Sequence, residues 1–253
     1  MKHLTILTGA SRGMGLAMAS QLIAPDAMLV CISRQRNTVL EREAHQEGAT
    51  LEQWALDLSD GAVAAARLGH WLRAQDPSNF ASATLINNAG VISDLVPLRD
   101  ALAGDLAHAL RVGLEAPMQL CAAFLGTTQQ WQIPRKVLNM SSGLGRRAMA
   151  SSSAYCAAKA GMDHFTRCLA LDEALQPNGA KVCALAPGVI DTDMQVQLRG
   201  ADQAVFPDQS AFASLHNQGQ LTSPAQAAQR ILRYLAHPDF GSLPVADIRE
   251  VAA

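Results

Sequence analysis

The sequence predicts an α/β protein in which one doubly wound, parallel β-sheet is covered by helices on both faces. Short β-rich runs alternate along the chain with stretches that are long enough for crossover helices. Several of these runs are almost entirely apolar, which is typical of parallel strands buried on both faces. The 253 residues, 49% of them hydrophobic, suffice for the core of a single domain spanning residues 1–253.

Strands are expected in six runs that are rich in β-branched and other apolar residues. These are Leu4–Thr8, Met28–Ser33, Thr50–Leu56, Thr84–Asn87, Lys136–Met140 and Lys181–Leu185. Four of the stretches between them have the length and composition of helices. These are Gly13–Ala24, Gly61–Ala74, Gly104–Leu125 and Ala154–Leu175.

An apolar stripe marks one face of the helix expected at Gly104–Leu125 and continues to its N-terminal side. Its members recur every four residues: Leu102, Leu106, Leu110, Leu114 and Met118. Such a stripe is more typical of a core-facing surface than of a contact between subunits. We therefore expect it to be buried in the core, with a subunit contact as the alternative.

The alternation of strand and helix breaks after Pro187. Residues 188–221 are rich in Gln and Asp, which predicts a long loop, and loops of this length often cover an active site. The regular pattern resumes at Ser223, a good N-cap residue, because Pro224 is suited to the first turn of a helix.

Composition excludes several functional classes. The formal charge of −2 gives no electrostatic footprint for nucleic acid, and no apolar stretch reaches the roughly 18 residues of a membrane span. Met1 and Lys2 lead directly toward the first expected strand, so no signal peptide and a cytoplasmic location are expected. The five cysteines are odd in number and show no paired spacing. We expect reduced thiols, mostly in the core, with no disulfide framework and no metal site.

Tyr155 and Lys159 lie four residues apart in an expected helix, so their side chains share one face. A free tyrosine has a pKa of about 10, which is too high for proton transfer at neutral pH. A cation beside the phenol favours the phenolate and lowers that pKa. Such a pair can give a proton to a carbonyl oxygen or take one from an alcohol.

A glycine-rich turn follows the first expected strand and opens directly into a helix. Strand, glycine turn and helix N-terminus together form a phosphate cradle, because backbone N–H groups and the helix dipole face the anion. The expected phosphate contacts are Gly9, Ser11, Arg12, Gly13, Met14 and Gly15.

The spacing of this turn resembles that of the short-chain dehydrogenase/reductase family, and the resemblance continues over nearly the whole chain. It is carried by five ordered motifs. These are Thr8-Gly9-Ala10-Ser11-Arg12-Gly13-Met14-Gly15, Asp57-Leu58, Asn87-Asn88-Ala89-Gly90, Ser142 thirteen positions before Tyr155, and Pro187-Gly188-Val189-Ile190-Asp191-Thr192.

The resemblance implies a Rossmann-type fold with a nicotinamide cofactor and a small carbonyl or alcohol substrate. It implies that Tyr155 is the acid/base, that Lys159 lowers its pKa and binds the nicotinamide ribose, and that Ser142 polarises the substrate carbonyl. Further cofactor contacts are implied at Asp57, Leu58, Asn88, Ala89, Gly90, Pro187, Gly188, Ile190 and Thr192, and substrate contacts at Ser142, Gly143 and Gly188. Ser141 and Ser151–Ser153 are expected to be polar turn residues. A homodimer or homotetramer built on the two long helices is also implied.

The end of the second expected strand indicates which cofactor is used. A site that prefers NAD places a carboxylate there for the ribose 2′-hydroxyl, whereas this strand ends in Ser33 and Arg34. Arg34, together with Arg12, can bind a 2′-phosphate through charge-assisted hydrogen bonds. The sequence therefore favours NADP(H).

Gly113 departs from the family pattern, in which asparagine stands at this position within Val-Asn-Leu. That asparagine is thought to hold a water linking the lysine to solvent. Glycine has no side chain for this, and it weakens a helix by about 1 kcal/mol relative to alanine. Either a water or a neighbouring group completes the proton path, or turnover is reduced.

The substrate class is read from the branch of the family. The run from Ser153 to Glu173, the segment 191–195 and the tail through Asp247 resemble the sepiapterin and benzil reductases, which reduce pterin side-chain carbonyls or vicinal diketones with NADPH. Asp247 either corresponds to a pterin-contacting aspartate or lies on the surface. A 3-oxoacyl-carrier-protein reductase is the alternative enzyme, for which Arg146 and Arg147 offer basic residues. A non-catalytic NADPH-binding regulatory protein is a third alternative.

Overall fold

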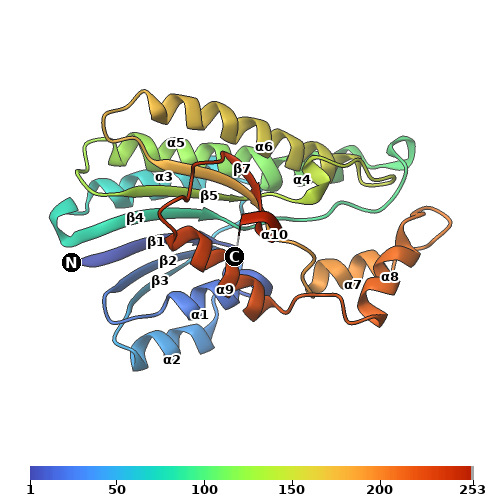
Figure 1. Ribbon diagram of the computed structural model, residues 1–253, viewed down its shortest axis with the longest axis horizontal. Helices are drawn as coiled ribbons and strands as arrows, with labels where there is room; N and C mark the ends of the chain where they lie inside the picture. The colour runs from blue at the N-terminus through green and yellow to red at the C-terminus, as the bar shows by residue number, and fades with distance from the viewer. Residues whose placement is uncertain (252–253) are drawn as a thin grey trace.

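Seven parallel strands form one sheet in the computed structural model of this protein, which describes residues 1–251. The strand order is β3-β2-β1-β4-β5-β6-β7, so the order reverses between β1 and β4 (Figure 1). The strands are β1 (Lys2–Thr8), β2 (Ala27–Ser33), β3 (Thr50–Ala55), β4 (Phe80–Asn87), β5 (Arg135–Met140), β6 (Lys181–Ala186) and β7 (Val245–Asp247). The predicted doubly wound fold is confirmed, and in such sheets the ligand cleft opens at the carboxyl ends of the strands beside the reversal.

Helices cover both faces of the sheet, with α1, α2 and α9 on one face and α3 to α6 on the other (Figure 1). The helices are α1 (Gly13–Leu22), α2 (Thr38–Gln46), α3 (Gly61–Arg73), α4 (Ala103–Leu110), α5 (Ala116–Thr128), α6 (Ser153–Ala174), α7 (Asp193–Arg199), α8 (Gln209–Asn217), α9 (Pro224–Ala236) and α10 (Ile248–Val251). Successive side chains of each strand point to opposite faces of the sheet, so the hydrophobic core has two parts, one on each face. In β1, Ile6 faces the α3–α6 layer, whereas Leu7 faces the α1–α9 layer.

The helix expected at Gly104–Leu125 is interrupted. Residues Arg111–Glu115 form a π-helical segment between α4 and α5, in which the Ala116 N–H donates to the Arg111 carbonyl. Pro117 lies in the first turn of α5 and has no N–H, so it cannot bond the Gly113 carbonyl four residues earlier. The wider π-helical turn accommodates the missing hydrogen bond, so α4 and α5 remain joined by continuous helical backbone.

Residues 188–221, expected to be a loop, contain the helices α7 and α8. Together they form a lobe that projects from the carboxyl end of the sheet (Figure 1). Their apolar residues pack into a small separate core in which Leu198 and Phe206 meet Leu95 and Met149 from earlier in the chain. Partners this distant in sequence produce no local periodicity, which is why the prediction of a continuous loop was wrong.

The apolar stripe is largely exposed, so the expectation that it lies in the core was wrong. Leu102 is 69% exposed, Leu110 is 40% exposed and Met118 is 42% exposed. Their helices instead turn other residues, such as Leu120 and Phe124, toward the sheet. A stripe of this kind is available for contact with another molecule.

The described residues include no helix that is long and apolar enough to cross a membrane. All five cysteines are free. Cys31, Cys121 and Cys183 are buried as expected, but Cys168 is exposed on α6.

Candidate active site

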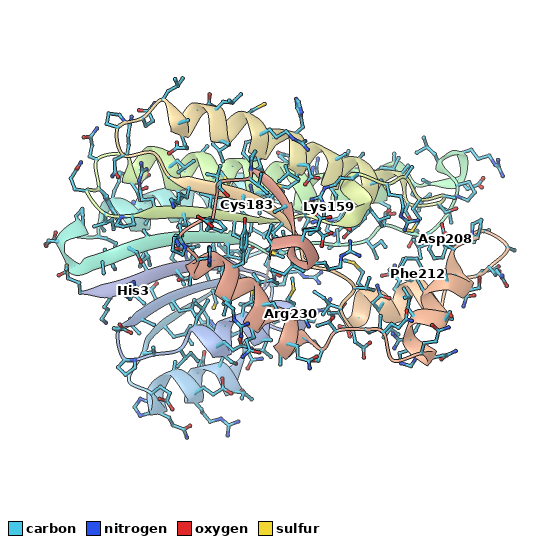
Figure 2. The ribbon with its side chains drawn as sticks, in the orientation of Figure 1. His3, Lys159, Cys183, Asp208, Phe212 and Arg230 are labelled. Atoms are coloured by element: carbon cyan, nitrogen blue, oxygen red, sulfur yellow. The ribbon has the colours of Figure 1, made fainter. Side chains whose placement is uncertain are left out.

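A cavity of about 470 Å³ lies at the carboxyl end of the sheet. It is lined by residues that directly follow β1, β4, β5 and β6, together with residues of α6, α7 and α8. Figure 2 shows Lys159 on α6 near the end of the sheet from which the α7–α8 lobe, with Phe212, projects. Every position that the sequence assigned to catalysis, cofactor or substrate lines this one cavity, and so does Asp247.

The glycine turn is packed too closely to accept side chains. A Cβ at Gly15 would lie 2.0 Å from the Gly9 carbonyl oxygen and 2.5 Å from the Asn88 Nδ2 atom. The Thr8 hydroxyl oxygen accepts hydrogen bonds from the backbone N–H groups of Asn88 (2.9 Å) and Ala89 (3.0 Å). The Thr-Gly and Asn-Asn-Ala-Gly motifs are therefore packed and hydrogen-bonded together. The resulting surface has no side chains in the way, so it allows the close backbone approach that a pyrophosphate needs.

Ser33 and Asn37 fix the glycine turn from the side of β2. The Ser33 hydroxyl accepts a hydrogen bond from the Ala10 N–H at 2.8 Å. The Asn37 amide caps α2 and donates to the Ser11 carbonyl at 3.1 Å. Ser33 was expected to contact the cofactor, and in this structure its hydroxyl oxygen also supports the turn.

The two arginines expected to bind a 2′-phosphate differ in their surroundings. Arg12 forms an ion pair with Asp193 of the α7–α8 lobe, with Nη1 and Oδ2 2.7 Å apart. Arg34 is exposed and lines the cavity, and its charge helps to lower the pKa of Asp57, although the hydrogen bond from the Ser59 N–H is the larger cause. Arg12 is thus already paired with a carboxylate in this structure, and its remaining N–H donors are the ones left for a phosphate.

Tyr155 and Lys159 are buried in the first two turns of α6, with relative exposures of 8% and 5%. The Lys159 Nζ atom lies 5.6 Å from the centroid of the Tyr155 ring. It donates a hydrogen bond of 2.7 Å to the Met140 carbonyl at the end of β5. One helical face therefore presents both groups to the cavity, as their spacing predicted.

Burial dominates the electrostatics of this pair. Burial raises the pKa of Tyr155, and the hydrogen bond with the Ser142 hydroxyl only partly offsets this. Burial also lowers the pKa of Lys159 to about 8, against the opposing charge of Asp163. The net pKa of Tyr155 is therefore raised and not lowered, because desolvation is the largest effect. At neutral pH the phenol is protonated and the lysine is mostly charged.

Several residues of the site escaped the sequence interpretation. Ser141, expected to be a turn residue, is buried and donates a hydrogen bond from its hydroxyl to the Asp163 carboxylate. Asp163 itself lies four residues beyond Lys159, so the helical spacing that joined Tyr155 to Lys159 extends to it. Arg249 lines the cavity beside Asp247, which is 3% exposed rather than on the surface.

No group of three or more histidine, cysteine, aspartate or glutamate side chains within residues 1–251 is arranged to hold a metal ion.

Gly113 is buried in the π-helical segment, where an added Cβ would lie 3.1 Å from the Ala158 Cβ of α6. We expect Gly113→Asn to leave kcat unchanged or to raise it, because the amide can hold a water near Lys159. Gly113→Ala is the matched control, since it adds the same Cβ without the amide. Steady-state kinetics of both variants separates the two effects. A large loss of kcat confined to Gly113→Asn would show that the glycine serves the reaction in another way.

Comparison with known proteins agrees with the geometry. The sequence profile described as short chain dehydrogenase matches residues 3–203. Benzil reductase ((S)-benzoin forming) of Bacillus cereus is 34% identical over 245 residues, covering 97% of this chain and 98% of that protein. Sepiapterin reductase of Meriones unguiculatus is 29% identical over 250 residues, covering 94% and 92%. The solved structure of the KRED1-Pglu enzyme matches with a TM-score of 0.81 at 26% identity, over 97% of this chain and 100% of that one.

Proposed function

Because the chain belongs to the short-chain dehydrogenase family and is an NAD(P)-dependent oxidoreductase, we propose that it is an NADPH-dependent carbonyl reductase. Its substrate is a ketone or a vicinal diketone, and Tyr155 is the proton donor. The observation that carries the proposal is the meeting of Tyr155, Lys159 and Ser142 in the same cavity as the glycine cradle.

NADPH, when bound, supplies the hydride. Tyr155 is protonated at neutral pH because burial raises its pKa, so its hydroxyl is ready to donate a proton to the carbonyl oxygen. The Ser142 hydroxyl donates a hydrogen bond to the same oxygen and polarises the carbonyl. The Lys159 cation stabilises the phenolate that remains.

The walls of the cavity support an apolar substrate. The lining includes Ile92, Leu144, Leu198 and Phe212, which also belong to the small core under the α7–α8 lobe. These side chains favour an apolar diketone over a polar one, because burying polar groups without partners is costly. Benzil, the substrate named in the Bacillus cereus relative, has this character.

A screen of NADPH oxidation tests the proposal. Vicinal diketones, pterins and 3-oxoacyl esters are offered to the purified protein, and the absorbance of NADPH is followed. We expect the highest kcat/KM with a diketone. Preference for 3-oxoacyl esters would favour the carrier-protein reductase, for which Arg147 is a basic residue at the cavity wall. NADPH binding with no turnover of any carbonyl would favour the regulatory alternative and overturn the proposal.

Arg34 is expected to set the preference for NADPH. Removing one charge-assisted contact costs about 1.5–3 kcal/mol, so Arg34→Ala should raise the KM for NADPH by roughly 10- to 100-fold. The KM for NADH should change little, because NADH has no 2′-phosphate. Arg36→Ala, which removes an exposed arginine outside this cavity, is the matched control. An unchanged NADPH/NADH ratio in Arg34→Ala would remove the argument for NADPH.

We also propose that the protein is a homodimer or homotetramer that covers the exposed stripe. Leu102, Leu110 and Met118 lie on α4, on α5 or next to them, and leave an apolar surface in the single chain. A monomer in light scattering would contradict this. The cytoplasmic location stays a prediction.

A further inference from the structure

A row of alternating charges leads from the catalytic helix to the wall of the cavity. Asp163 follows Lys159 by one turn of α6. Arg146, in the turn after the catalytic serine, donates from Nε to the Asp163 Oδ2 atom at 3.2 Å, and its Nη1 lies 3.9 Å from the Asp247 Oδ2 atom. Arg249 donates to Asp247 from Nη2 at 2.6 Å and from Nε at 2.8 Å. The row thus has the order Lys159, Asp163, Arg146, Asp247, Arg249.

Asp163 is only 2% exposed, and each of its two carboxylate oxygens accepts a hydrogen bond from another side chain. The Ser141 hydroxyl donates to Oδ1 and Arg146 donates to Oδ2. The turn approaches α6 so closely that a Cβ at Gly145 would lie 2.9 Å from the Lys159 carbonyl oxygen and 3.0 Å from Asp163 Oδ2. A buried carboxylate is tolerated only when it is paired in this way, so Asp163 fixes where the turn sits against the helix.

Arg146 extends the connection to the end of the chain. Its Nη2 donates to the Ala246 carbonyl at 2.9 Å, across a separation of 100 residues. Ala246 belongs to β7, which has only three residues and ends at Asp247, a residue that lines the cavity. Arg146 therefore holds the turn that carries Ser142 and the strand that carries Asp247 at a fixed spacing.

We propose that Asp163 and Arg146 are positioning residues of this active site, which hold the charge of Lys159 and set the serine turn against the C-terminal wall of the cavity. The inference rests on the proposed function, since it assigns these residues to the same reaction. Neither residue touches the reacting atoms. Each acts through a neighbour: Asp163 through Lys159 and Ser141, and Arg146 through Asp163 and β7.

The charge of Asp163 raises the pKa of Lys159, against the burial that lowers it to about 8. Other titratable groups face this region. Tyr155 of α6 and Cys183 of β6 are neutral at neutral pH. Burial raises the pKa of both side chains, to about 11 for Cys183. Asp247 is ionised and held by Arg249, whose hydrogen bond lowers its pKa. The charge on Lys159 is therefore sensitive to Asp163. Because Arg146 is paired with that same carboxylate, we expect loss of its positive charge to act on Lys159 with the opposite sign.

Asp163→Asn keeps the shape of the side chain and removes its charge. The pKa of Lys159 should fall further, so the alkaline limb of the kcat profile for carbonyl reduction should move to lower pH by about one unit. Arg146→Gln removes the neighbouring positive charge and should move the same limb to higher pH. Arg146→Lys should restore the wild-type profile. Asp172→Asn, an exposed charge removal on the same helix, is the matched control and should leave the profile unchanged.

Opposite shifts in Asp163→Asn and Arg146→Gln support the inference, because a purely structural role would lower the rate without moving the profile in opposite directions. Profiles that coincide with wild type in both variants would overturn it. Arg146 is partly exposed, with 36% of its side chain accessible, so its variants test the inference even where Asp163→Asn does not fold. The pH dependence of NADPH binding, followed by NADPH fluorescence, gives a second readout that needs no turnover. If wild-type protein turns over no carbonyl, the proposed function fails, while this binding profile still decides the inference.

Discussion

Replacing Tyr155 by phenylalanine should lower kcat for carbonyl reduction by roughly 100- to 10,000-fold, the contribution that a positioned general acid makes. The variant loses only the phenolic hydroxyl, and the ring remains packed in a site that is 8% exposed. No solvent proton reaches the carbonyl oxygen as readily as the buried hydroxyl does. Affinity for NADPH should stay within a few-fold of wild type, because the glycine cradle is untouched. Stopped-flow or steady-state assays of NADPH oxidation measure the first effect, and a fluorescence titration measures the second.

Tyr234 is the matched control, since the chain has two tyrosines and both are buried. The Tyr234 hydroxyl lies 3.9 Å from the Cys183 Sγ atom, within the core between α9 and the sheet. Tyr234→Phe should therefore cost some stability and leave kcat close to wild type. If Tyr155→Phe kept wild-type turnover, the proton donor would have to be another group and the mechanism proposed above would be wrong.

Gly15→Ala should destabilise the fold by about 3 kcal/mol or more and should remove measurable NADPH binding. The new methyl group would lie 2.0 Å from the Gly9 carbonyl oxygen, a contact that neither backbone segment can relieve without moving. The first turn of α1 would be pushed away from β1, and the backbone N–H groups of the cradle would no longer point toward the bound anion. Thermal unfolding with and without NADPH measures both losses, because a ligand stabilises only the folded state that binds it.

Gly126→Ala separates this clash from the general effect of removing a glycine. Gly126 lies in α5, where an added Cβ meets nothing within 4 Å. The substitution should be neutral or should stabilise the protein by up to about 1 kcal/mol, since alanine is the better helix former. Wild-type Tm and NADPH affinity in Gly15→Ala would contradict the packing described for the cradle.

The sequence predicted those strands and helices whose own residues show the hydrophobic pattern of the element. Most of the six predicted strands were found because they are buried on both faces and therefore read as apolar runs, whereas the edge strand β3 is only partly buried. Helix α2 was missed because it is mostly exposed and buries only Leu40 and Ala44. Strand β7 is too short to leave a pattern, and α7 and α8 depend on partners such as Leu95 that lie far away in the chain.

The features of the candidate site also divide into those that local sequence could predict and those that it could not. Tyr155, Lys159 and the glycine turn could be predicted because helical spacing and backbone geometry act over a few residues. The π-helical segment at Gly113 could not be, although Pro117 is a local cause, because a proline defect can equally end or kink a helix.

By itself, the sequence determined which chemical groups this protein can bring to a carbonyl: a phenol, an ammonium, a serine hydroxyl and a cradle for phosphate. The tertiary structure alone decided how these groups behave. It raised the pKa of Tyr155 by burial, and it placed Arg12 on Asp193 and Arg146 on Asp163 and β7. Burial and charge act through space, and these partners are 17 to 181 residues apart along the chain. Only folding brings such groups within a few ångströms of one another, so no local pattern could have shown how they interact.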